Sequence, residues 1–199
     1  MLKLLLILLI LKLKTMTNPY SIGKFIYLRH PTNKDVSGDW YQWLSDPEIT
    51  KYMPERYWPN SLESQREFFN SLQTSKNRLV LAICDIQTDT HIGIMSLSNI
   101  NWVHKSAEIA FIIGNEKFKT GSYIIEAISL MLKIAFSKLN FKNILSKHVS
   151  SHQITPLMLK RFNFKTVGRL INYVEIDNSL KDLVLDQLSL EDWKKISSN

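Results

Sequence analysis

The pattern of hydrophobic and polar positions changes its period several times along the chain, and each change predicts a different element. Short apolar runs with the length of strands alternate with segments in which apolar side chains recur every three or four residues, as on one face of a helix. The predicted strands cover residues 25–29, 79–84, 91–97, 107–113, 143–149, 165–175 and 183–188. The predicted helices cover residues 33–45, 61–75, 124–139 and 155–162. This order predicts an α+β fold with six to seven strands and about four helices.

Capping signals mark the starts of three of these helices. Thr32 precedes the first helix as a typical N-cap residue. Asn60 and Glu63 have the spacing of a capping box ahead of the second helix. Thr155 followed by Pro156 is a typical pair of N-cap and first helical residue for the last helix.

Turn residues predict two antiparallel hairpins. A turn at residues 85–89 joins the strands at 79–84 and 91–97, and a second turn at 177–179 joins the last two strands. The strand at 107–113 is almost wholly apolar, which predicts burial on both of its faces inside the sheet.

The first fifteen residues differ from the rest of the chain. Residues 4–11 are all aliphatic and are bracketed by lysines. A helix needs roughly 20 residues to cross a bilayer, and no small-residue cleavage site follows this run. We therefore predict a cytoplasmic protein without stable membrane insertion, made of an extension at 1–15 and one domain at 16–199. We expect the extension to come from a start assigned upstream of Met16, with a weak interfacial anchor as the competing interpretation.

Composition and charge narrow the classes of function. The 199 residues are 45% hydrophobic and 22% charged, which is ordinary for a folded domain. The net charge of +7 does not indicate a nucleic-acid partner, because three lysines lie in residues 1–15 and the other basic residues are interleaved with acids. The single cysteine, Cys84, excludes an internal disulfide and a cysteine-based zinc cluster. The histidines lack the spacing of metal ligands, so we expect no metal.

A series of short strings follows a characteristic order between residues 27 and 188. The strings are Leu28-Arg29, Trp43-Leu44-Ser45-Asp46-Pro47-Glu48, Ile92-Gly93, Ala107-Glu108-Ile109, Tyr123 with Glu126-Ala127, Phe162-Asn163-Phe164 and Lys181-Asp182. Together they resemble the GNAT superfamily of acyl-CoA-dependent N-acetyltransferases. Within that superfamily the chain is most similar to the branch of ribosomal-protein N-terminal acetyltransferases and amino-sugar acetyltransferases.

The resemblance implies a mixed, mostly antiparallel and twisted sheet that is splayed between its fourth and fifth strands. Acetyl-CoA, the implied co-substrate, would lie in that gap, with backbone groups near Phe111 and Ile113 facing its pantetheine amides. The implied phosphate loop contains Lys119, Thr120, Gly121, Ser122, Tyr123 and Ile124.

Physical chemistry supports an anion site at this loop independently of the resemblance. A helix N-terminus presents free N–H groups and the positive end of the helix dipole. In the family this loop has a glycine, one further residue and then a glycine or alanine. Ser122 and Ile124 stand at those two positions here, and Gly121 lies one place earlier. We expect the side chains of Ser122 and Ile124 to narrow the phosphate site.

Acetyl transfer from a thioester to an amine needs a neutral amine, a polarised carbonyl and a proton for the leaving thiolate. The resemblance places substrate-facing polar groups near the start of the strand at 107–113, so Glu108 and His104 are the candidate bases. The resemblance also implies a tyrosine that acts as the general acid, but Leu159 occupies the position where the family often has it. His152 is therefore the candidate acid. The structural alternatives are a Glu108 paired with a basic neighbour and histidines that are only loop residues.

The acceptor is predicted to be a small-molecule primary amine. Arg56, Tyr57 and Trp58 lie in a predicted loop and are the candidate substrate-binding residues. Our first hypothesis is an amino sugar, free or nucleotide-linked, onto which aromatic rings could stack. The alternatives are a protein N-terminal amine and a non-catalytic acyl-CoA-binding module.

Overall fold

The computed structural model describes residues 16–197, whose strands form one eight-stranded sheet. The strand order is β1-β2-β3-β4-β5-β6-β8-β7, and only β5 and β6 run parallel to each other. The strands are β1 (Ser21–Ile22), β2 (Ile26–Arg29), β3 (Leu79–Asp85), β4 (His91–Asn101), β5 (Ser106–Ile113), β6 (Asn143–Val149), β7 (Lys165–Ile176) and β8 (Ser179–Ser189). Both predicted hairpins, β3–β4 and β7–β8, are confirmed.

Six α-helices lie in the described part of the chain. They are α2 (Asn33–Val36), α3 (Trp40–Trp43), α4 (Leu62–Leu72), α5 (Gly121–Lys133), α6 (Ile154–Lys160) and α7 (Leu190–Ser197). Shorter helical turns are η1 (Pro54–Tyr57), η2 (Glu116–Phe118) and η3 (Ile134–Lys138), the last of them π-helical. The predicted α+β class is confirmed, but the predictions of six to seven strands and about four helices were too low.

The additional elements are short, so they leave little periodicity in the sequence. β1 has two residues, and the chain that leads from it into β2 is fixed by Glu126 of α5. The Glu126 carboxylate accepts hydrogen bonds from the backbone N–H groups of Lys24, of Phe25 at 2.8 Å and of Ile26 at 3.0 Å. The helix predicted at 33–45 is divided into α2 and α3, because residues 37–39, which include Gly38, do not continue it.

The capping predictions had mixed outcomes. Thr32 does begin α2, in a reciprocal capping box with Asp35. Asn60 does not cap α4; Ser61 does, and its hydroxyl accepts a hydrogen bond from the Ser64 N–H at 3.1 Å. Thr155 is also not a cap, because α6 already begins one residue earlier. At α4 the neighbouring Ser61 has the extended backbone that a capping residue adopts, whereas Gln153 before α6 has right-handed helical backbone angles and makes no side-chain cap.

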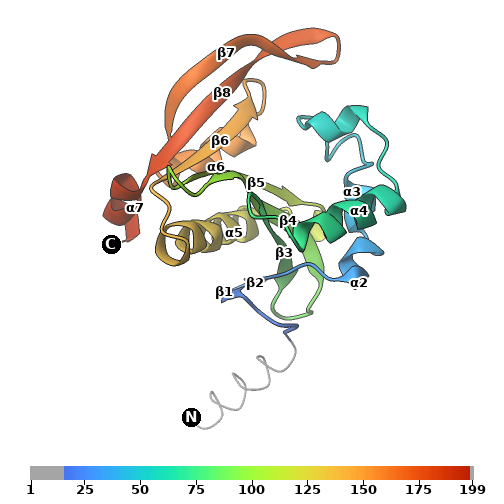
Figure 1. The fold of residues 1–199 in the computed structure, drawn as a ribbon. Helices are drawn as coiled ribbons and strands as arrows, with labels where there is room; N and C mark the ends of the chain where they lie inside the picture. The colour runs from blue at the N-terminus through green and yellow to red at the C-terminus, as the bar shows by residue number, and fades with distance from the viewer. Residues whose placement is uncertain (1–15, 198–199) are drawn as a thin grey trace.

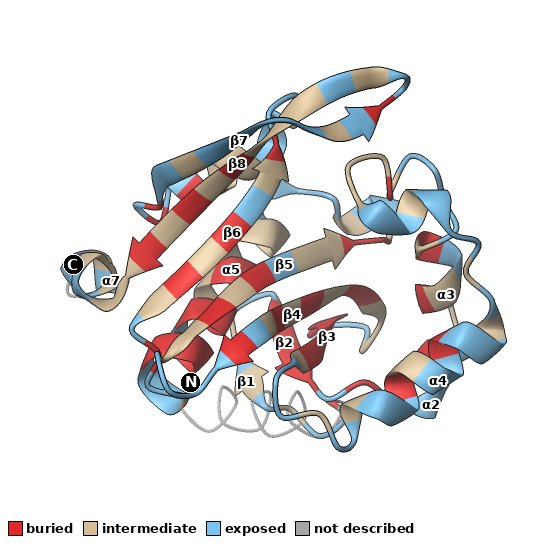
Figure 2. Ribbon diagram, turned by 45° about the horizontal axis from the view of Figure 1, so that its top comes forward, coloured by how far each residue is buried: buried red, intermediate tan, exposed pale blue. Residues whose placement is uncertain are grey.

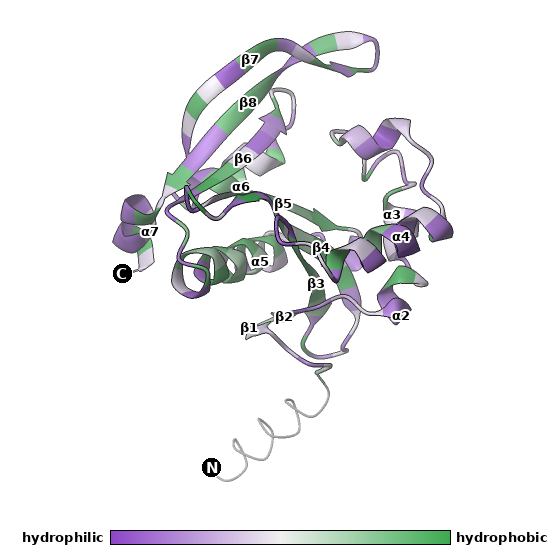
Figure 3. Cartoon of the chain, in the orientation of Figure 1, coloured by the Kyte–Doolittle hydropathy of each residue, from purple (hydrophilic) through white to green (hydrophobic). Residues whose placement is uncertain are grey.

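Helices cover both faces of the sheet (Figure 1). α5 is strongly apolar, lies under the centre of the sheet and packs on the inward side chains of β2 to β6 (Figure 3). On the opposite face, Val36, Trp40 and Trp43 of α2 and α3 and Phe69 of α4 form a second cluster with Val80 of β3. Figure 2 shows that most buried positions of the central strands lie between these helical layers.

β5 is less buried than its apolar sequence predicts. Ala110 is exposed, and Phe111 and Ile112 are only partly buried. The reason is that the second half of this strand has a hydrogen-bonded neighbour on one side only, as the register of the sheet shows.

The sheet divides where β5 meets β6. The two strands pair only through Ser106–Glu108 of β5 and Asn143–Leu145 of β6. Beyond these residues β5 stays paired with β4, and β6 stays paired with β8 as far as Val149. The two halves of the sheet therefore diverge, which confirms the predicted splay. The strands labelled β5 and β6 are the fourth and fifth of the predicted strands, because the short strand β1 was not predicted.

Between residues 16 and 197, the structure contains no helix with the length and apolar character that crossing a membrane requires. The predicted N-terminal extension, residues 1–15, lies outside the described residues.

Candidate active site

The gap between β5 and β6 begins directly after Glu108, which is the last residue of β5 paired with β6. The Glu108 carboxylate forms an ion pair with Lys147 of β6, with Oε1 and Nζ 2.8 Å apart. This contact joins the two halves of the sheet at the closed end of the gap. Glu108 is thus paired with a basic neighbour, as the structural alternative predicted, and it also lies at the floor of the gap.

The N-terminus of α5 follows the open end of β5. Thr120 is the N-cap residue, and the N–H groups of the first helical turn, Gly121, Ser122 and Tyr123, have no acceptor within the helix. A Cβ atom built on Gly121 would meet nothing within 4 Å, so the space beside this residue of the first turn is open. Lys119 lies beside this helix end and is ion-paired with Glu116. The predicted loop residues therefore form a helix start with free donors.

Two predicted loop residues pack against the core. Ile124 is partly buried against the main hydrophobic cluster, and the expectation that its side chain narrows the phosphate site stays a prediction. Tyr123 also packs there, with its ring 5.2 Å from that of Phe118, and its hydroxyl donates to Asp85 Oδ1 at 3.1 Å. Burial and then this hydrogen bond raise the pKa of Tyr123.

Phe111 and Ile113 lie in the part of β5 that has left β6. They pair with Met95 and Gly93 of β4. The opposite edge of β5 has no strand partner at these two residues, because β5 and β6 pair only as far as Glu108. The structure thus places the two predicted backbone positions beside the gap.

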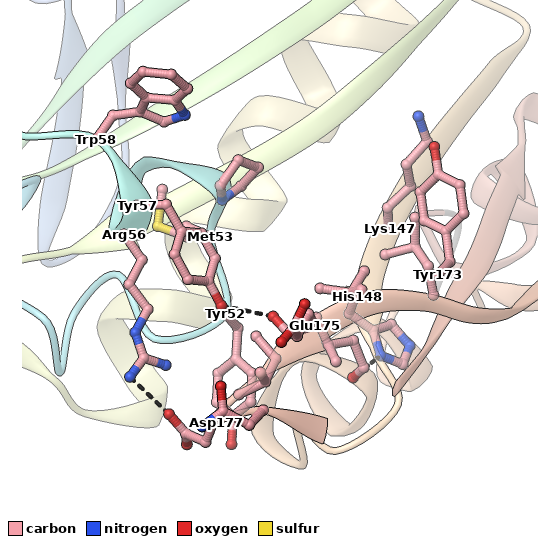
Figure 4. A pocket seen from close by; sticks show the side chains of 16 residues that line it. Tyr52, Met53, Arg56, Tyr57, Trp58, Lys147, His148, Tyr173, Glu175 and Asp177 are labelled. Atoms are coloured by element: carbon pink, nitrogen blue, oxygen red, sulfur yellow. Dashed lines mark hydrogen bonds and ion pairs between the residues drawn. The ribbon is translucent and has the colours of Figure 1, made fainter. Parts of the chain in front are cut away.

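A cavity of about 920 Å³ lies between the two halves of the molecule (Figure 4). One wall is the segment 52–58, which follows α3 and contains η1. The other wall is formed by the end of β6 and by the tip of the β7–β8 hairpin, which contributes residues 173–178. A smaller cavity of about 410 Å³ between α4 and the sheet shares Met53 with it.

The three predicted acceptor residues all line the larger cavity. Arg56 donates to Asp177 Oδ1 at 2.8 Å, and the Tyr57 hydroxyl donates to the Glu175 carbonyl at 2.6 Å. Both bonds connect the segment 52–58 to the β7–β8 hairpin across the cavity, as the dashed lines in Figure 4 show. Trp58 makes no such bond and is 76% exposed.

Comparison with known proteins identifies the family. Residues 26–165, more than half of the chain, match the family described as acetyltransferase (GNAT) domain. The chain belongs to the GNAT acetyltransferases. An uncharacterised N-acetyltransferase, p20, from Bacillus licheniformis is 25% identical over 149 residues, which cover 74% of this chain and 83% of that protein.

Solved structures share the fold of this GNAT acetyltransferase. A spermidine N-acetyltransferase from Vibrio cholerae in complex with CoA and spermine superposes with a TM-score of 0.79 at 19% identity, covering 86% of this chain and 99% of that chain. A GNAT-family acetyltransferase from Bacillus anthracis superposes with a TM-score of 0.72 at 20% identity, covering 86% and 98%. The protein is therefore an N-acetyltransferase that uses acetyl-CoA as co-substrate.

The geometry of this GNAT acetyltransferase fits acetyl-CoA. The gap supplies a strand edge at Phe111 and Ile113, and the α5 N-terminus supplies free N–H donors beside open space at Gly121. Backbone donors at a helix N-terminus bind phosphate oxygens well, because the helix dipole adds to the hydrogen bonds. The shifted position of the loop glycine therefore still leaves an anion site.

The two candidate histidines lie far apart in the structure. His104 is exposed in the turn between β4 and β5, at the end where β5 and β6 are still paired, and it does not line either cavity. His152 lies beyond the open end of β6, and its ring centroid is 4.5 Å from that of Tyr52. Burial, and then the neighbouring charge of His148, lower the pKa of His152. Of the two, the structure brings only His152 to the cavity region.

The cavity also contains residues that the sequence did not single out. Tyr52, Lys147, Tyr173 and Glu175 line it from three segments that are distant along the chain. Tyr52 lies in a segment rich in aromatic residues, for which helical spacing predicts core packing. The others lie on strands whose alternation predicts only that one face is exposed, so no local signal distinguishes them.

The described residues contain no cluster of three or more histidine, cysteine, aspartate or glutamate side chains that could hold a metal ion. Cys84 is buried within β3. Burial raises the pKa of the Cys84 thiol to about 12, so it remains a protonated core side chain and not a nucleophile.

Proposed function

We propose that this acetyltransferase transfers acetyl to the primary amine of an amino sugar, free or nucleotide-linked, bound in the cavity of about 920 Å³. The observation that carries the proposal is the lining of that cavity, which combines exposed aromatic rings with a balanced set of charges.

The aromatic rings come from both walls. Tyr57 and Trp58 on one wall are 57% and 76% exposed, and Tyr173 on the other is 64% exposed. Large aromatic side chains seldom stay this exposed without a partner when several gather at one cavity. An aromatic face binds both the apolar face of a ring and a nearby ammonium group, which are the two features of a protonated amino sugar.

The charges favour a compact acceptor over a long polycation. Among the described lining residues, Glu175 and Asp177 are the carboxylates, and Arg56 and Lys147 are the full cations, so the lining is formally neutral. Asp177 is already neutralised by Arg56, with 2.8 Å between the charged atoms. A polyamine would need several carboxylates that are not already paired, since each buried ammonium requires a compensating charge.

Glu108 is proposed to take the proton from the acceptor amine. It lies at the floor of the gap, and an ionised carboxylate can only accept hydrogen bonds. A base at this position would contribute roughly 10²- to 10⁴-fold to the rate. The free N–H groups at the start of α5 would hold the pyrophosphate of acetyl-CoA, which supplies the activated acetyl group.

A consumption assay with acetyl-CoA tests the acceptor. The screen compares amino sugars, nucleotide-linked amino sugars, polyamines and peptides with free N-termini at equal concentrations. The proposal expects the highest kcat/KM for an amino sugar and a large rise in KM when Trp58 is replaced by Ala. Faster acetylation of spermidine or of a peptide would refute the amino-sugar assignment while leaving acetyl transfer itself intact.

A further inference from the structure

We propose that the smaller cavity, of about 410 Å³, binds an oxygen-bearing part of the acceptor, and that Gln65 is the specificity-determining residue that selects for this oxygen. The inference rests on the proposed function, because it concerns the acceptor of the same reaction. It adds that the enzyme prefers an amine with a nearby carbonyl, hydroxyl or phosphoryl oxygen over an amine whose only polar groups are N–H groups.

The smaller cavity lies on the face of the sheet that carries Glu108. Its floor consists of alternate residues of two paired strands, Ile94, Ser96 and Ser98 of β4 and Ala110 and Ile112 of β5. Ser96 pairs with Ala110, and Ser98 pairs with Glu108. Because paired residues of antiparallel strands have their side chains on the same face, Glu108 continues the row that forms this floor.

This arrangement connects the smaller cavity to the proposed base. Ala110 lies two residues from Glu108, about 7 Å along the strand. The cavity also shares Met53 with the larger cavity, so the two spaces adjoin. An acceptor whose amine lies at Glu108 can therefore extend a substituent over Ala110 and into the smaller cavity.

Gln65 of α4 brings a buried donor without an acceptor to this cavity. The residue is 1% exposed, and it lines the cavity from the side opposite the sheet. Its Nε2 atom has no hydrogen-bond partner in the described part of the chain. Buried polar groups are nearly always hydrogen-bonded, because a desolvated donor without an acceptor is costly. An acceptor atom of a ligand in the cavity would satisfy this donor.

The orientation of the Gln65 amide follows from its neighbour. The side-chain amide of Asn60 lies 3.2 Å from the Tyr41 carbonyl and 3.2 Å from the Gln65 amide. A carbonyl can only accept, so the Asn60 atom at this place is Nδ2, and the Gln65 atom that accepts from it is Oε1. Turning the Gln65 amide over would bring two donors together. The free group is therefore Nε2, which carries two N–H donors.

Two free N–H donors require an oxygen with lone pairs. An ammonium group has only donors and cannot satisfy them, whereas the partly exposed hydroxyls of Ser96 and Ser98 can both donate to and accept from a substrate hydroxyl. Among the described residues that line the smaller cavity, Glu55 and Arg78 are the charged ones, so the lining has no net negative charge to attract a polycation.

The chemistry of this cavity separates the candidate acceptors. Its volume of about 410 Å³ lies within the usual range for small-molecule sites. An amino sugar carries several oxygens close to its amine, and a peptide N-terminus carries a carbonyl two atoms from its amine. Spermidine carries no oxygen. The free donor of Gln65 therefore disfavours polyamines and favours the oxygen-bearing classes.

The first test follows the side-chain amide of Gln65 by NMR on the isotope-labelled full-length protein in the presence of CoA. Its two N–H signals are assigned from their absence in Gln65→Glu. The probes are glucosamine and a dipeptide with a free N-terminus, which carry oxygen, and cyclohexylamine and spermidine, which do not. We expect an oxygen-bearing probe to shift these signals and the oxygen-free amines to leave them in place. Signals that stay in place with both oxygen-bearing probes, or that move equally with cyclohexylamine, would overturn the inference.

The second test separates substrate selection from a structural role. Gln65→Met should lower the ratio of kcat/KM between the best oxygen-bearing acceptor and cyclohexylamine by about tenfold, the usual effect of one hydrogen bond to a buried group. Gln65→Glu keeps the oxygen that accepts from Asn60 but loses the free donor, so it should lower the same ratio and raise relative turnover of spermidine. A wild-type ratio in Gln65→Glu would show that Gln65 only holds Asn60, and would refute the inference.

The matched control is Gln73→Met. Gln73 is an exposed glutamine at the end of the same helix, and it lines neither cavity. This variant should keep the wild-type ratio, and thermal denaturation confirms that each variant folds. If the dipeptide shifts the Gln65 signals and is the better substrate, the amino-sugar proposal fails while the role of Gln65 stands. If glucosamine is the best substrate but the signals stay in place, the role of Gln65 fails alone.

Discussion

Replacing Glu108 by Gln tests the proposed base with almost no change in side-chain size. The variant keeps a polar group at the floor of the gap but removes the negative charge and the ability to accept a proton. We expect turnover to fall by about 10²- to 10⁴-fold, the usual contribution of general base catalysis. The affinity for acetyl-CoA should change little, because the donors that face its phosphates lie on α5.

The structure limits how much the loss of the ion pair alone can contribute. Glu108 and Lys147 are 2.8 Å apart, but their side chains are 22% and 39% exposed. Ion pairs of this kind contribute at most about 1 kcal/mol. If that whole amount were lost from the transition state, the rate would fall about fivefold, since 1.36 kcal/mol corresponds to tenfold. A hundredfold loss therefore cannot come from the ion pair.

The control is Lys147→Met, which breaks the same ion pair and leaves the Glu108 carboxylate in place. Steady-state kinetics give kcat and KM for each variant, calorimetric titration gives the affinity for acetyl-CoA, and thermal denaturation confirms folding. We expect Glu108→Gln to be at least tenfold slower than Lys147→Met. Equal and small losses in both variants would refute the catalytic role and leave Glu108 as one half of a structural ion pair.

Two further predictions concern stability. Burial raises the pKa of Asp35, but its hydrogen bonds with Arg29 outweigh that effect and hold the folded-state pKa at about 2, against 3.8 for a free carboxyl. This lowered pKa contributes about 2 kcal/mol to the free energy of unfolding above pH 3.8, and the contribution is lost as the pH falls towards 2. Denaturant titrations of the wild type should therefore show the free energy of unfolding falling between these pH values. The same fall in Asp35→Asn would contradict the reasoning. Gly114→Ala should lower the free energy of unfolding by about 1–3 kcal/mol, because its Cβ would come within 2.0 Å of the Trp43 ring. Gly121→Ala, whose Cβ meets nothing, is the control, and equal stabilities of the two variants would refute this packing argument.

The sequence predicted those parts of the fold that depend on local patterns. β6 has the predicted bounds, Asn143–Val149, because its apolar run is flanked by turn residues on both sides. The single helix predicted at 33–45 failed because its apolar spacing continues across Gly38, where the backbone does not. Spacing records which side chains share a face, but it does not record whether the backbone between them stays helical.

The sequence predicted residues of the candidate site only where a polar side chain stands out from the pattern of its own strand or loop. Glu108 is a lone carboxylate that contrasts with its apolar strand, and it is a candidate because the GNAT resemblance implies substrate-facing polar groups at the start of that strand. Tyr52 and Lys147 lack such a contrast, and their meeting with His152 and Glu108 depends on how the two halves of the sheet diverge. The Tyr52–His152 contact joins segments that are one hundred residues apart, and the Glu108–Lys147 contact joins two neighbouring strands. Local periodicity in the sequence contains no information about either contact.

The central claim is that acetyl-CoA lies between β5 and β6 with its phosphates at the start of α5. Residue-resolved amide hydrogen exchange, with and without saturating acetyl-CoA, tests this claim directly. We expect exchange to slow at Phe111 and Ile113 of β5 and at the first turn of α5, Gly121 to Tyr123. Unchanged exchange at both places, with protection appearing elsewhere in the chain, would contradict the account.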